Sequence, residues 1–405
     1  MRRVFLPLVA GTFFFAGFLA GVSKTISGED EYSYIKLFTD VLKIVKENYV
    51  ENPSIKDLIY GALGGMVSSL DPFSAFFPPD RYEEFMEETE GEFGGIGIEI
   101  SMEKGRPIVV APIEGTPAFK EGLRAGDIII AVDGEDTFGK TLMEIVKKIR
   151  GKPGTKVRLT IMRRGVDKPF SVEITRDIIK IESVKYTSYE GIGYVKVTQF
   201  QHHTSRDLKK AIKDLLSRGV KGIILDLRNN PGGLLSEAVK VSDLFIPEGK
   251  LIVYTKGRRN EERFYAKEPA VVPPGMPIVV LINRGSASAS EIVSGALQDH
   301  GRAIILGEGS FGKASVQNII PLEDGSAVKL TVAYYYTPKG RLIHKKGIEP
   351  DVEVVMKPET WEKLTQEIRR LKIEGNGQKV ILLPDIDIQL RKALEIINTG
   401  QKEAA

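Results

Sequence analysis

At 405 residues, with 42% hydrophobic and 27% charged residues, the chain has room for two or three domains with a sizeable core. It contains no cysteine, which excludes disulfides, thiolate catalysis and cysteine–zinc sites, and its four histidines leave little material for another metal site. We therefore expect no metal and no other cofactor. A formal net charge of +3, without a basic stripe, gives no reason to expect a nucleic-acid partner.

The amino terminus has the composition of a membrane segment. Arg2 and Arg3 precede an uncharged, largely apolar run over residues 4–22, close to the roughly 20 residues that span a bilayer. Flanking arginines favour a cytoplasmic amino end, so everything after Lys24 is expected outside the cytoplasmic membrane. Residues 1–24 are predicted to be either an uncleaved membrane anchor or a cleaved signal peptide, although no good small-residue cleavage site is visible.

Residues 30–90 are predicted to form a helical amino-terminal domain. Apolar residues recur at three- and four-residue spacing over 35–49 and again over 58–70, and Pro53 lies between the two segments. A third, acidic helix is expected to begin at the Pro78–Pro79 pair and to run through Glu90.

Residues 91–177 change to short strands and turns. A glycine-rich segment over 94–97 runs into an alternating strand, and the segment 122–130 (GLRAGDIII) is followed by an Asp-Gly turn at 133–134 between apolar runs. A helix over 142–150 and a strand over 157–163 complete a unit of ordinary small-domain size.

This ordered set of turns resembles a PDZ domain. Such domains bind an extended peptide as an added strand and capture its terminal carboxylate with backbone N–H groups. The resemblance implies a peptide-binding loop formed by Gly94, Gly95 and Gly97, with Ile96 and Ile98 lining an apolar pocket.

From residue 178 to residue 352 the chain alternates strands and helices. Buried strands are expected over 194–200, 222–227 and 277–283, with helices between them, which predicts a sheet covered by helices. Residues 353–405 return to helices. The predicted fold class is multidomain α/β, with a helical amino-terminal region, an inserted PDZ-like β-rich domain, an α/β sheet-and-helix core and a helical carboxy-terminal tail.

The segment 285–291 (GSASASE) carries the first candidate for chemistry. Ser288 follows a predicted strand and lies in the first turn of a helix expected over 287–299. Free N–H groups and the positive end of the helix dipole would there stabilise an oxyanion on an attacked carbonyl. The alternative is that Ser286, Ser288 and Ser290 are only helix caps, a position that serine favours.

Lys313 favours the catalytic interpretation. Lys313, Ser315 and Gln317 are expected on one face of a strand, because side chains repeat every second residue. A lysine on a covered face loses water, which lowers its pKa from about 10.4 toward the roughly 7–8 that suits a general base.

These segments resemble the carboxy-terminal processing peptidases, also called tail-specific proteases, a serine–lysine family. The resemblance rests on GSASASE at 285–291 and FGKASVQ at 311–317, and it extends over nearly the whole chain after the anchor. Further family motifs are LDP with a following serine at 70–74, DLRNNPGG at 226–233 and GIEPD at 347–351. Ala314 departs from the glycine that is common at its position.

The resemblance implies Ser288 as nucleophile, Lys313 as general base and Gln317 as the residue that orients the lysine. Beside Ser288, the Pro-Gly-Gly turn lets backbone N–H groups approach a ligand closely, so Gly232 or Gly233 would join Ala289 as the oxyanion hole. We expect Asp299 to be structural. His300 is adjacent to it in sequence and is a poor candidate for the base of a serine–histidine–aspartate triad.

The function implied is an exported or membrane-anchored serine endopeptidase of the cell envelope, with its catalytic part in the periplasm. Its partners would be proteins or peptides with free carboxyl termini, the membrane through residues 1–24, and possible homodimerisation through the terminal helices. The alternative is a catalytically silent PDZ scaffold or a partner-gated assembly protein; the presence of Ser288, Lys313 and Gln317 together speaks against it.

Overall fold

The computed structural model describes residues 27–402, except residues 114, 259 and 374–379. The chain divides into two compact units, Met1–Leu70 and Asp71–Ala405. The membrane segment predicted over residues 1–24 lies outside the described residues. Within the described ranges, no helix combines the length and apolar character needed to cross a membrane.

The described residues of the first unit form two helices, α1 (Ser27–Asn48) and α2 (Ile55–Ser68). Helix α2 begins at a serine cap, because the side chain of Ser54 accepts the backbone N–H of Asp57 at 3.3 Å. Many apolar side chains of α1 are exposed, among them Ile35 and Ile44. Both segments are helices, as predicted for this region.

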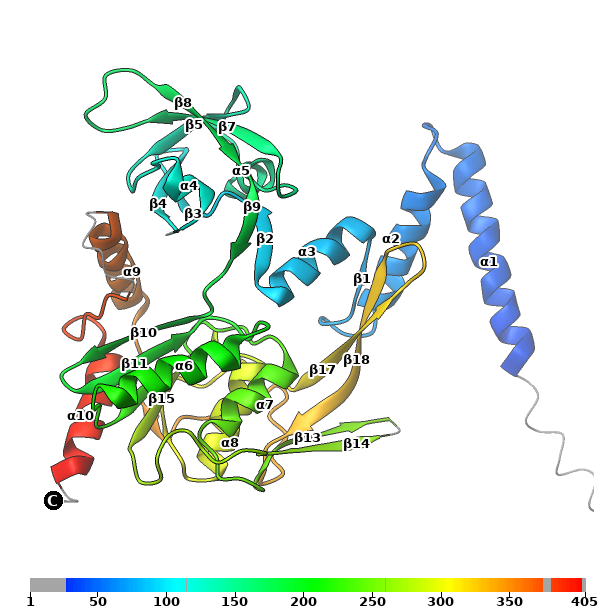
Figure 1. The fold of residues 1–405 in the computed structure, drawn as a ribbon. Coiled ribbons are helices and arrows are strands. Elements are labelled where there is room, and N and C mark those ends of the chain that lie inside the picture. The colour runs from blue at the N-terminus through cyan, green and yellow to red at the C-terminus, as the bar shows by residue number, and fades with distance from the viewer. Residues whose placement is uncertain (1–26, 114, 259, 374–379, 403–405) are drawn as a thin grey trace, which may run out of the picture. The chain divides into compact units, whose positions relative to one another are not determined.

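The second unit opens with a short strand and a helix. Strand β1 (Ala75–Phe77) is followed by α3 (Pro79–Glu90), which has a proline at its first position and ends at Gly91 with a φ of 75°. The β2–β9 ribbon follows: strand β2 (Glu92–Gly95) pairs in antiparallel fashion with β9 (Asp177–Lys180), so the chain enters and leaves the inserted domain side by side (Figure 1).

The inserted domain is a small antiparallel sheet with its own core. The sheet has the order β3-β4-β5-β7-β8, with β6 paired to β5. Its strands are β3 (Ile98–Glu103), β4 (Arg106–Pro112), β5 (Ile128–Val132), β6 (Glu135–Asp136), β7 (Lys156–Met162) and β8 (Phe170–Thr175). Helices α4 (Pro117–Lys120) and α5 (Leu142–Ile149) cover it, and the core includes Val109, Ile129, Leu159 and Ile161.

The Asp-Gly turn predicted in this domain is present. Asp133 and Gly134 both have positive φ, 49° and 84°, and they join β5 to β6 as the two residues of a tight hairpin.

The α/β core is built on a six-stranded sheet with the order β10-β11-β12-β15-β16-β19, parallel except at the β10–β11 pair. Its strands are β10 (Val184–Tyr189), β11 (Ile192–Val197), β12 (Ile223–Asp226), β15 (Ile278–Ile282), β16 (Ile304–Gly307) and β19 (Val352–Glu353). Helices α6 (Thr204–Ser217), α7 (Leu235–Asp243) and α8 (Ala289–Asp299) pack on one face. Helix α10 (Ile388–Lys402) packs on the other face (Figure 1).

A second sheet of the core has the order β1-β18-β13-β14, with β17 also paired to β18. Its remaining strands are β13 (Leu251–Gly257), β14 (Glu261–Tyr265), β17 (Ser315–Pro321) and β18 (Ala327–Tyr336). Helix α9 (Pro358–Ile373) precedes α10 in the tail. The predicted fold class is confirmed: a multidomain α/β chain with an inserted β-rich domain and a helical tail.

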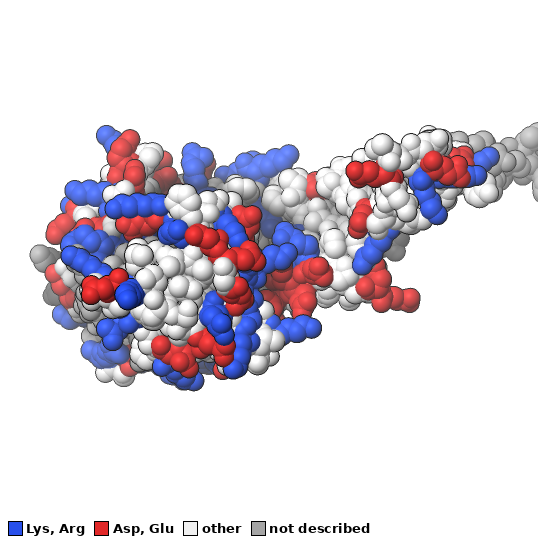
Figure 2. Space-filling model, turned by 90° about the horizontal axis from the view of Figure 1, so that it is seen from above, with Lys and Arg blue, Asp and Glu red and all other residues white. Residues whose placement is uncertain are grey.

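The surface carries both signs of charge. On the face drawn in Figure 2, basic and acidic side chains are interspersed rather than gathered by sign. This distribution agrees with the near-balance of 57 basic and 54 acidic residues.

Candidate active site

Ser288 lies between the end of β15 and the start of α8. Its backbone has φ 53° and ψ −112°, a conformation that costs a non-glycine residue free energy of order 1–3 kcal/mol. The side chain is partly exposed and lines a cavity of about 460 Å³. A strained serine at a helix amino terminus, open to a cavity, is the geometry expected of a nucleophile.

The neighbouring serines have structural roles. The hydroxyl of Ser286 donates to the carbonyl oxygen of Leu227 at 2.8 Å, and that of Ser290 donates to the carbonyl oxygen of Asn230 at 2.9 Å. Both side chains are fully buried. Of the three serines that the sequence offered, Ser288 alone lines the cavity.

Lys313 lines the same cavity. Its ammonium nitrogen lies 4.8 Å from the centre of the Phe73 ring, and the residue is half-buried. Loss of hydration on burial is the largest cause that lowers the pKa of Lys313, and the positive charge of Lys329 lowers it further. Glu291 and Asp71 act in the opposite direction, but the pKa remains below the usual value of 10.5.

Lys313 is not part of a strand, contrary to the sequence prediction. Strand β17 begins two residues later, at Ser315. The carbonyl oxygen of Lys313 instead accepts the hydroxyl of Tyr335 at 2.5 Å, and the same hydroxyl lies 3.0 Å from the carbonyl oxygen of Ser288. Tyr335 therefore ties the backbones of the two candidate catalytic residues together.

Gln317 lies on β17 and also lines the cavity. Its amide nitrogen donates to the hydroxyl of Ser315 at 2.8 Å and lies 3.4 Å from that of Thr331. Ser74 joins this group, because its hydroxyl accepts the N–H of Thr331 at 3.1 Å. That Gln317 orients Lys313 remains a prediction.

Glu291, to which the sequence reasoning assigned no role, joins the two catalytic segments. Its carboxylate is fully buried and accepts the backbone N–H groups of Ser288, Gly312 and Lys313 at 2.8, 2.7 and 2.9 Å. The hydroxyl of Ser310 donates to it at 2.5 Å. A serine followed three residues later by glutamate is the pattern of a capping box, which would have indicated the contact to Ser288.

The Pro-Gly-Gly turn lies against Ser288. A Cβ added at Gly232, which has a φ of 104°, would meet the carbonyl oxygen of Ala287 and the Cβ of Ser288 at 2.7 Å each. The N–H of Gly232, however, already donates to the side chain of Asn230 at 2.9 Å. In the described part of the chain, the N–H groups of Gly233 and Ala289 donate to no acceptor. The two therefore suit an oxyanion hole better than Gly232 does.

Asn230 holds this arrangement and was also missed. It is fully buried, and its amide donates to the carbonyl oxygen of Val197 at 2.8 Å. Its backbone carbonyl oxygen accepts the N–H of Ala287 at 3.0 Å. One asparagine thus joins the end of β11 to the residue before Ser288 and to the Pro-Gly-Gly turn.

His300 and Asp299 lie at the other end of α8. Over the 11 residues of that helix the separation from Ser288 is about 16 Å. His300 contacts the carbonyl oxygen of Leu251 at 2.7 Å, and Asp299 pairs with Arg341. A triad with Ser288 is excluded, and the structural role expected for Asp299 is the one observed.

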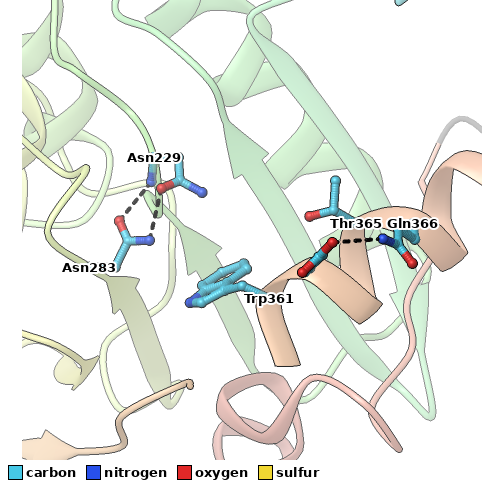
Figure 3. A pocket seen from close by; sticks show the side chains of 6 residues that line it. Asn229, Asn283, Trp361, Thr365 and Gln366 are labelled. Atoms are coloured by element: carbon cyan, nitrogen blue, oxygen red, sulfur yellow. Dashed lines mark hydrogen bonds between the residues drawn. The ribbon is translucent and has the colours of Figure 1, made fainter. Parts of the chain in front are cut away.

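A second cavity, of about 420 Å³, is lined in part by Asn229, Asn283 and Trp361 (Figure 3). The N–H of Asn229 donates to the side-chain oxygen of Asn283 at 2.9 Å, and the amide of Asn283 donates back to the side chain of Asn229 at 2.9 Å. These bonds join the ends of β12 and β15.

A buried ionic cluster adjoins this cavity. The Arg228 guanidinium donates to both oxygens of Asp387 at 2.9 Å and to Asp226 at 2.7 and 3.0 Å, and it lies 5.3 Å from the Trp361 ring centre. Arg228 lowers the pKa of Asp226 against the opposing effect of burial. The carboxy-terminal segment is thereby attached to the motif that carries the glycine turn.

The glycine-rich segment of the inserted domain is more structured than predicted. Gly94 and Gly95 belong to β2, paired with β9, and the carbonyl oxygen of Gly94 accepts the N–H of Gly151 at 3.1 Å. Ile96 is buried in the domain core and Gly97 has a φ of 79°. The loop is therefore confined to Ile96 and Gly97, and whether it binds a carboxylate remains a prediction.

Comparison with known proteins agrees with this architecture. Residues 191–354 match peptidase family S41, and residues 94–174 match the PDZ domain. The class defined is a peptidase that carries a PDZ domain.

Individual relatives narrow this class. The chain is 46% identical over 362 residues to a carboxy-terminal-processing protease of Bartonella bacilliformis, covering 87% of this chain and 83% of the relative. A probable CtpA-like serine protease of Staphylococcus aureus is 37% identical, over 87% of this chain and 73% of that protein. A solved photosystem II D1 C-terminal processing protease is 31% identical with a TM-score of 0.47, over 80% of this chain and 93% of that one. The chain belongs to the carboxy-terminal processing peptidases of family S41, as its motifs predicted.

Proposed function

We propose that the chain is a serine endopeptidase that cleaves proteins near their carboxyl ends, with Ser288 as nucleophile and Lys313 as general base. The observation that carries this proposal is the cavity of about 460 Å³ that both residues line. A strained backbone at Ser288 and a lowered pKa at Lys313 are the properties that such a pair requires.

The reaction would be acyl transfer. Neutral Lys313 accepts the hydroxyl proton of Ser288 while Oγ attacks the scissile carbonyl. The ammonium of Lys313 then gives that proton to the leaving amine as the peptide bond breaks. Water, deprotonated by Lys313, hydrolyses the ester and releases the carboxylate product and free Ser288.

The oxyanion of each tetrahedral intermediate would be held by the N–H groups of Gly233 and Ala289. Both lack an acceptor within the described residues, and Ala289 is the first residue of α8, where the helix dipole favours negative charge. Gly232 would contribute through its close approach to Ser288 rather than through its own N–H.

The PDZ domain would recognise substrate. Strand β3 lies at the edge of its sheet, paired only with β4 among the described strands, so it has a free side for an extended peptide. We propose that the loop of Ile96 and Gly97 captures the terminal carboxylate.

We also propose that the catalytic part acts outside the cytoplasmic membrane, in the cell envelope. The support is the apolar run over residues 4–22 preceded by Arg2 and Arg3. Cell fractionation, with protease added to intact spheroplasts, tests the location. Amino-terminal sequencing of the mature protein then distinguishes an anchor from a cleaved signal.

The test of function is cleavage of an unfolded model protein with an apolar carboxyl tail by the full-length chain in mild detergent. Wild type is expected to cut, whereas Ser288→Ala and Lys313→Ala are expected to be folded, by circular dichroism, and inert. Cleavage by Lys313→Ala at near wild-type rate would show that the base is misassigned. A folded wild type that cuts no tail would favour the scaffold or partner-gated alternative.

A further inference from the structure

The cavity that holds Ser288 contains a second lysine that the proposed reaction does not use. Among the described residues that line it, the charged side chains are Lys313 and Lys329, and none is an aspartate or glutamate. The remaining walls are mainly apolar and aromatic, including Phe85, Phe200 and Leu235. The cavity is therefore positively charged in a weakly polar setting.

Lys329 is held firmly in the middle of β18. It pairs with Ala75 of β1 on one side and with Ile319 of β17 on the other. Its ammonium nitrogen lies 5.4 Å from the ring centre of Phe77 and 5.7 Å from that of Phe85. These two rings stack on each other at 5.2 Å, so the lysine rests on a fixed aromatic surface.

Lys329 has no ion-pair partner within 4.0 Å in the described ranges of the chain. The acid that influences it, Asp71, is already engaged, because its carboxylate accepts the N–H groups of Phe73 and Ser74 and the hydroxyl of Ser74. Burial lowers the pKa of Lys329. The two aromatic rings offset only part of the cost of desolvating a half-buried cation that has no paired carboxylate, and a bound anion would offset more of it.

The chemistry of a peptide identifies that anion. The backbone inside the cavity is neutral, so a peptide supplies negative charge only through its free carboxyl terminus or an acidic side chain. Lys313 gives its proton to the leaving amine, and the charge of Lys329 acts directly on Lys313. Because Lys329 lines the same cavity as Lys313, a group that reaches it is expected on the fragment whose amine Lys313 protonates.

We propose that Lys329 binds the terminal carboxylate of the departing fragment and so favours cleavage a few residues from a free carboxyl end. This inference rests on the proposed function and adds to it a specificity residue within the catalytic cavity: the PDZ loop would hold the carboxylate when the substrate is first bound, and Lys329 would hold it during cleavage. The aromatic contacts of Phe77 and Phe85 fix the ammonium, and the weakly polar walls strengthen its attraction for a carboxylate.

The test uses peptides that share one cleavage sequence and release fragments of increasing length, each made as free acid and as carboxyl amide. For at least one length, wild type is expected to cleave the acid with a kcat/KM about tenfold higher than the amide, the effect of a charge-assisted hydrogen bond. Lys329→Met is expected to remove this preference, and Lys329→Arg to keep part of it. An amidated peptide with aspartate at the end distinguishes an acidic side chain from the terminal carboxylate.

Lys256 offers a matched control. It also lies on a strand of this sheet and over two rings, 5.3 Å from Tyr254 and 5.4 Å from Tyr336, but it does not line the cavity. Lys256→Met is expected to keep the wild-type preference. Equal cleavage of acid and amide at every length, or a preference that survives Lys329→Met, would overturn the proposal.

Binding to an inert variant separates this proposal from the proposed function. The Ser288→Ala chain is expected to bind the free-acid product peptide about tenfold more tightly than a chain that also carries Lys329→Met. Because no turnover is needed, this difference is measurable even if no peptide is cleaved. Equal binding would overturn the role of Lys329, whereas absent cleavage with unequal binding would overturn only the serine–lysine mechanism.

Discussion

The backbone N–H of Lys313 donates to the same carboxylate oxygen of Glu291 that accepts the N–H of Ser288, at 2.9 and 2.8 Å. The two candidate catalytic residues are 25 positions apart in the sequence, yet their backbones share one buried acceptor. The relative position of nucleophile and base is therefore set by a side chain that need not contact the substrate.

Replacing this carboxylate is expected to impair both stability and activity. In Glu291→Gln, an amide group would face some of the four donors, so the free energy of unfolding should fall by about 3 kcal/mol. Displacement of Ser288 from Lys313 should lower kcat/KM at least about 100-fold. Urea unfolding and peptide cleavage measure the two effects. Glu367→Gln, at an exposed ion pair on α9, is the control and should change neither.

The rate of cleavage should depend on pH through Lys313. Only the neutral amine accepts a proton, so kcat should rise with pH through a pKa that lies below 10.5. Lys329 lowers that pKa, while Glu291 and Asp71 raise it. Lys329→Met should therefore move the rising limb to higher pH for an amidated peptide. If kcat of Lys329→Met rises over the same pH range as that of wild type, the electrostatic coupling of the two lysines is contradicted.

Gly232→Ala is expected to abolish most of the activity. The added methyl group would lie 2.7 Å from Ser288 Cβ and from a backbone oxygen, and the φ of 104° disfavours alanine. We expect at least about a 100-fold loss of kcat/KM in steady-state kinetics. Gly249→Ala is the matched control, because its φ is 77° but nothing lies within 4 Å of the added carbon. A similar loss of kcat/KM in both variants would mean that backbone strain, rather than contact with Ser288, causes the effect.

The ionic cluster of Arg228 should contribute mainly to stability. Asp387→Asn removes one of its two buried carboxylates, and breaking such a pair typically costs about 3–5 kcal/mol. Asp387 also caps α10 by accepting the N–H of Leu390 at 3.0 Å. Denaturant unfolding measures the change, with Asp385→Asn, at an exposed position of the same segment, as control. If the two variants have the same free energy of unfolding, Asp226 alone is sufficient to neutralise the buried charge of Arg228.

Local signals made several elements predictable. Helix α3 begins at the proline pair and ends before Gly91, as expected, because the missing N–H of proline and the positive φ of glycine act at the helix ends themselves. Helix α5 is fixed by a capping box between Thr141 and Glu144. The candidate site was predictable for the same reason: Ser288 follows a buried strand and heads a helix.

Contacts between distant segments were not predictable from the sequence pattern. Arg228 and Asp387 are separated by 159 positions, and no local periodicity pairs them. Lys313 was expected on a strand because its alternation with Ser315 and Gln317 fits one. Its backbone bonds instead to side chains, because its N–H donates to Glu291 and its carbonyl oxygen accepts the hydroxyl of Tyr335. Gly94 likewise looked like a free loop, but its pairing depends on β9, more than eighty residues away.

The central claim, that Ser288 forms the covalent intermediate with Lys313 as its base, is tested most directly by trapping the acyl-enzyme. The full-length chain is mixed with a slowly hydrolysed peptide ester, quenched in acid, digested and analysed by mass spectrometry. The account predicts that the acyl group is found on Ser288 in wild type and is absent from both Ser288→Ala and Lys313→Ala. An acyl group on another residue, or undiminished acylation in Lys313→Ala, would contradict it.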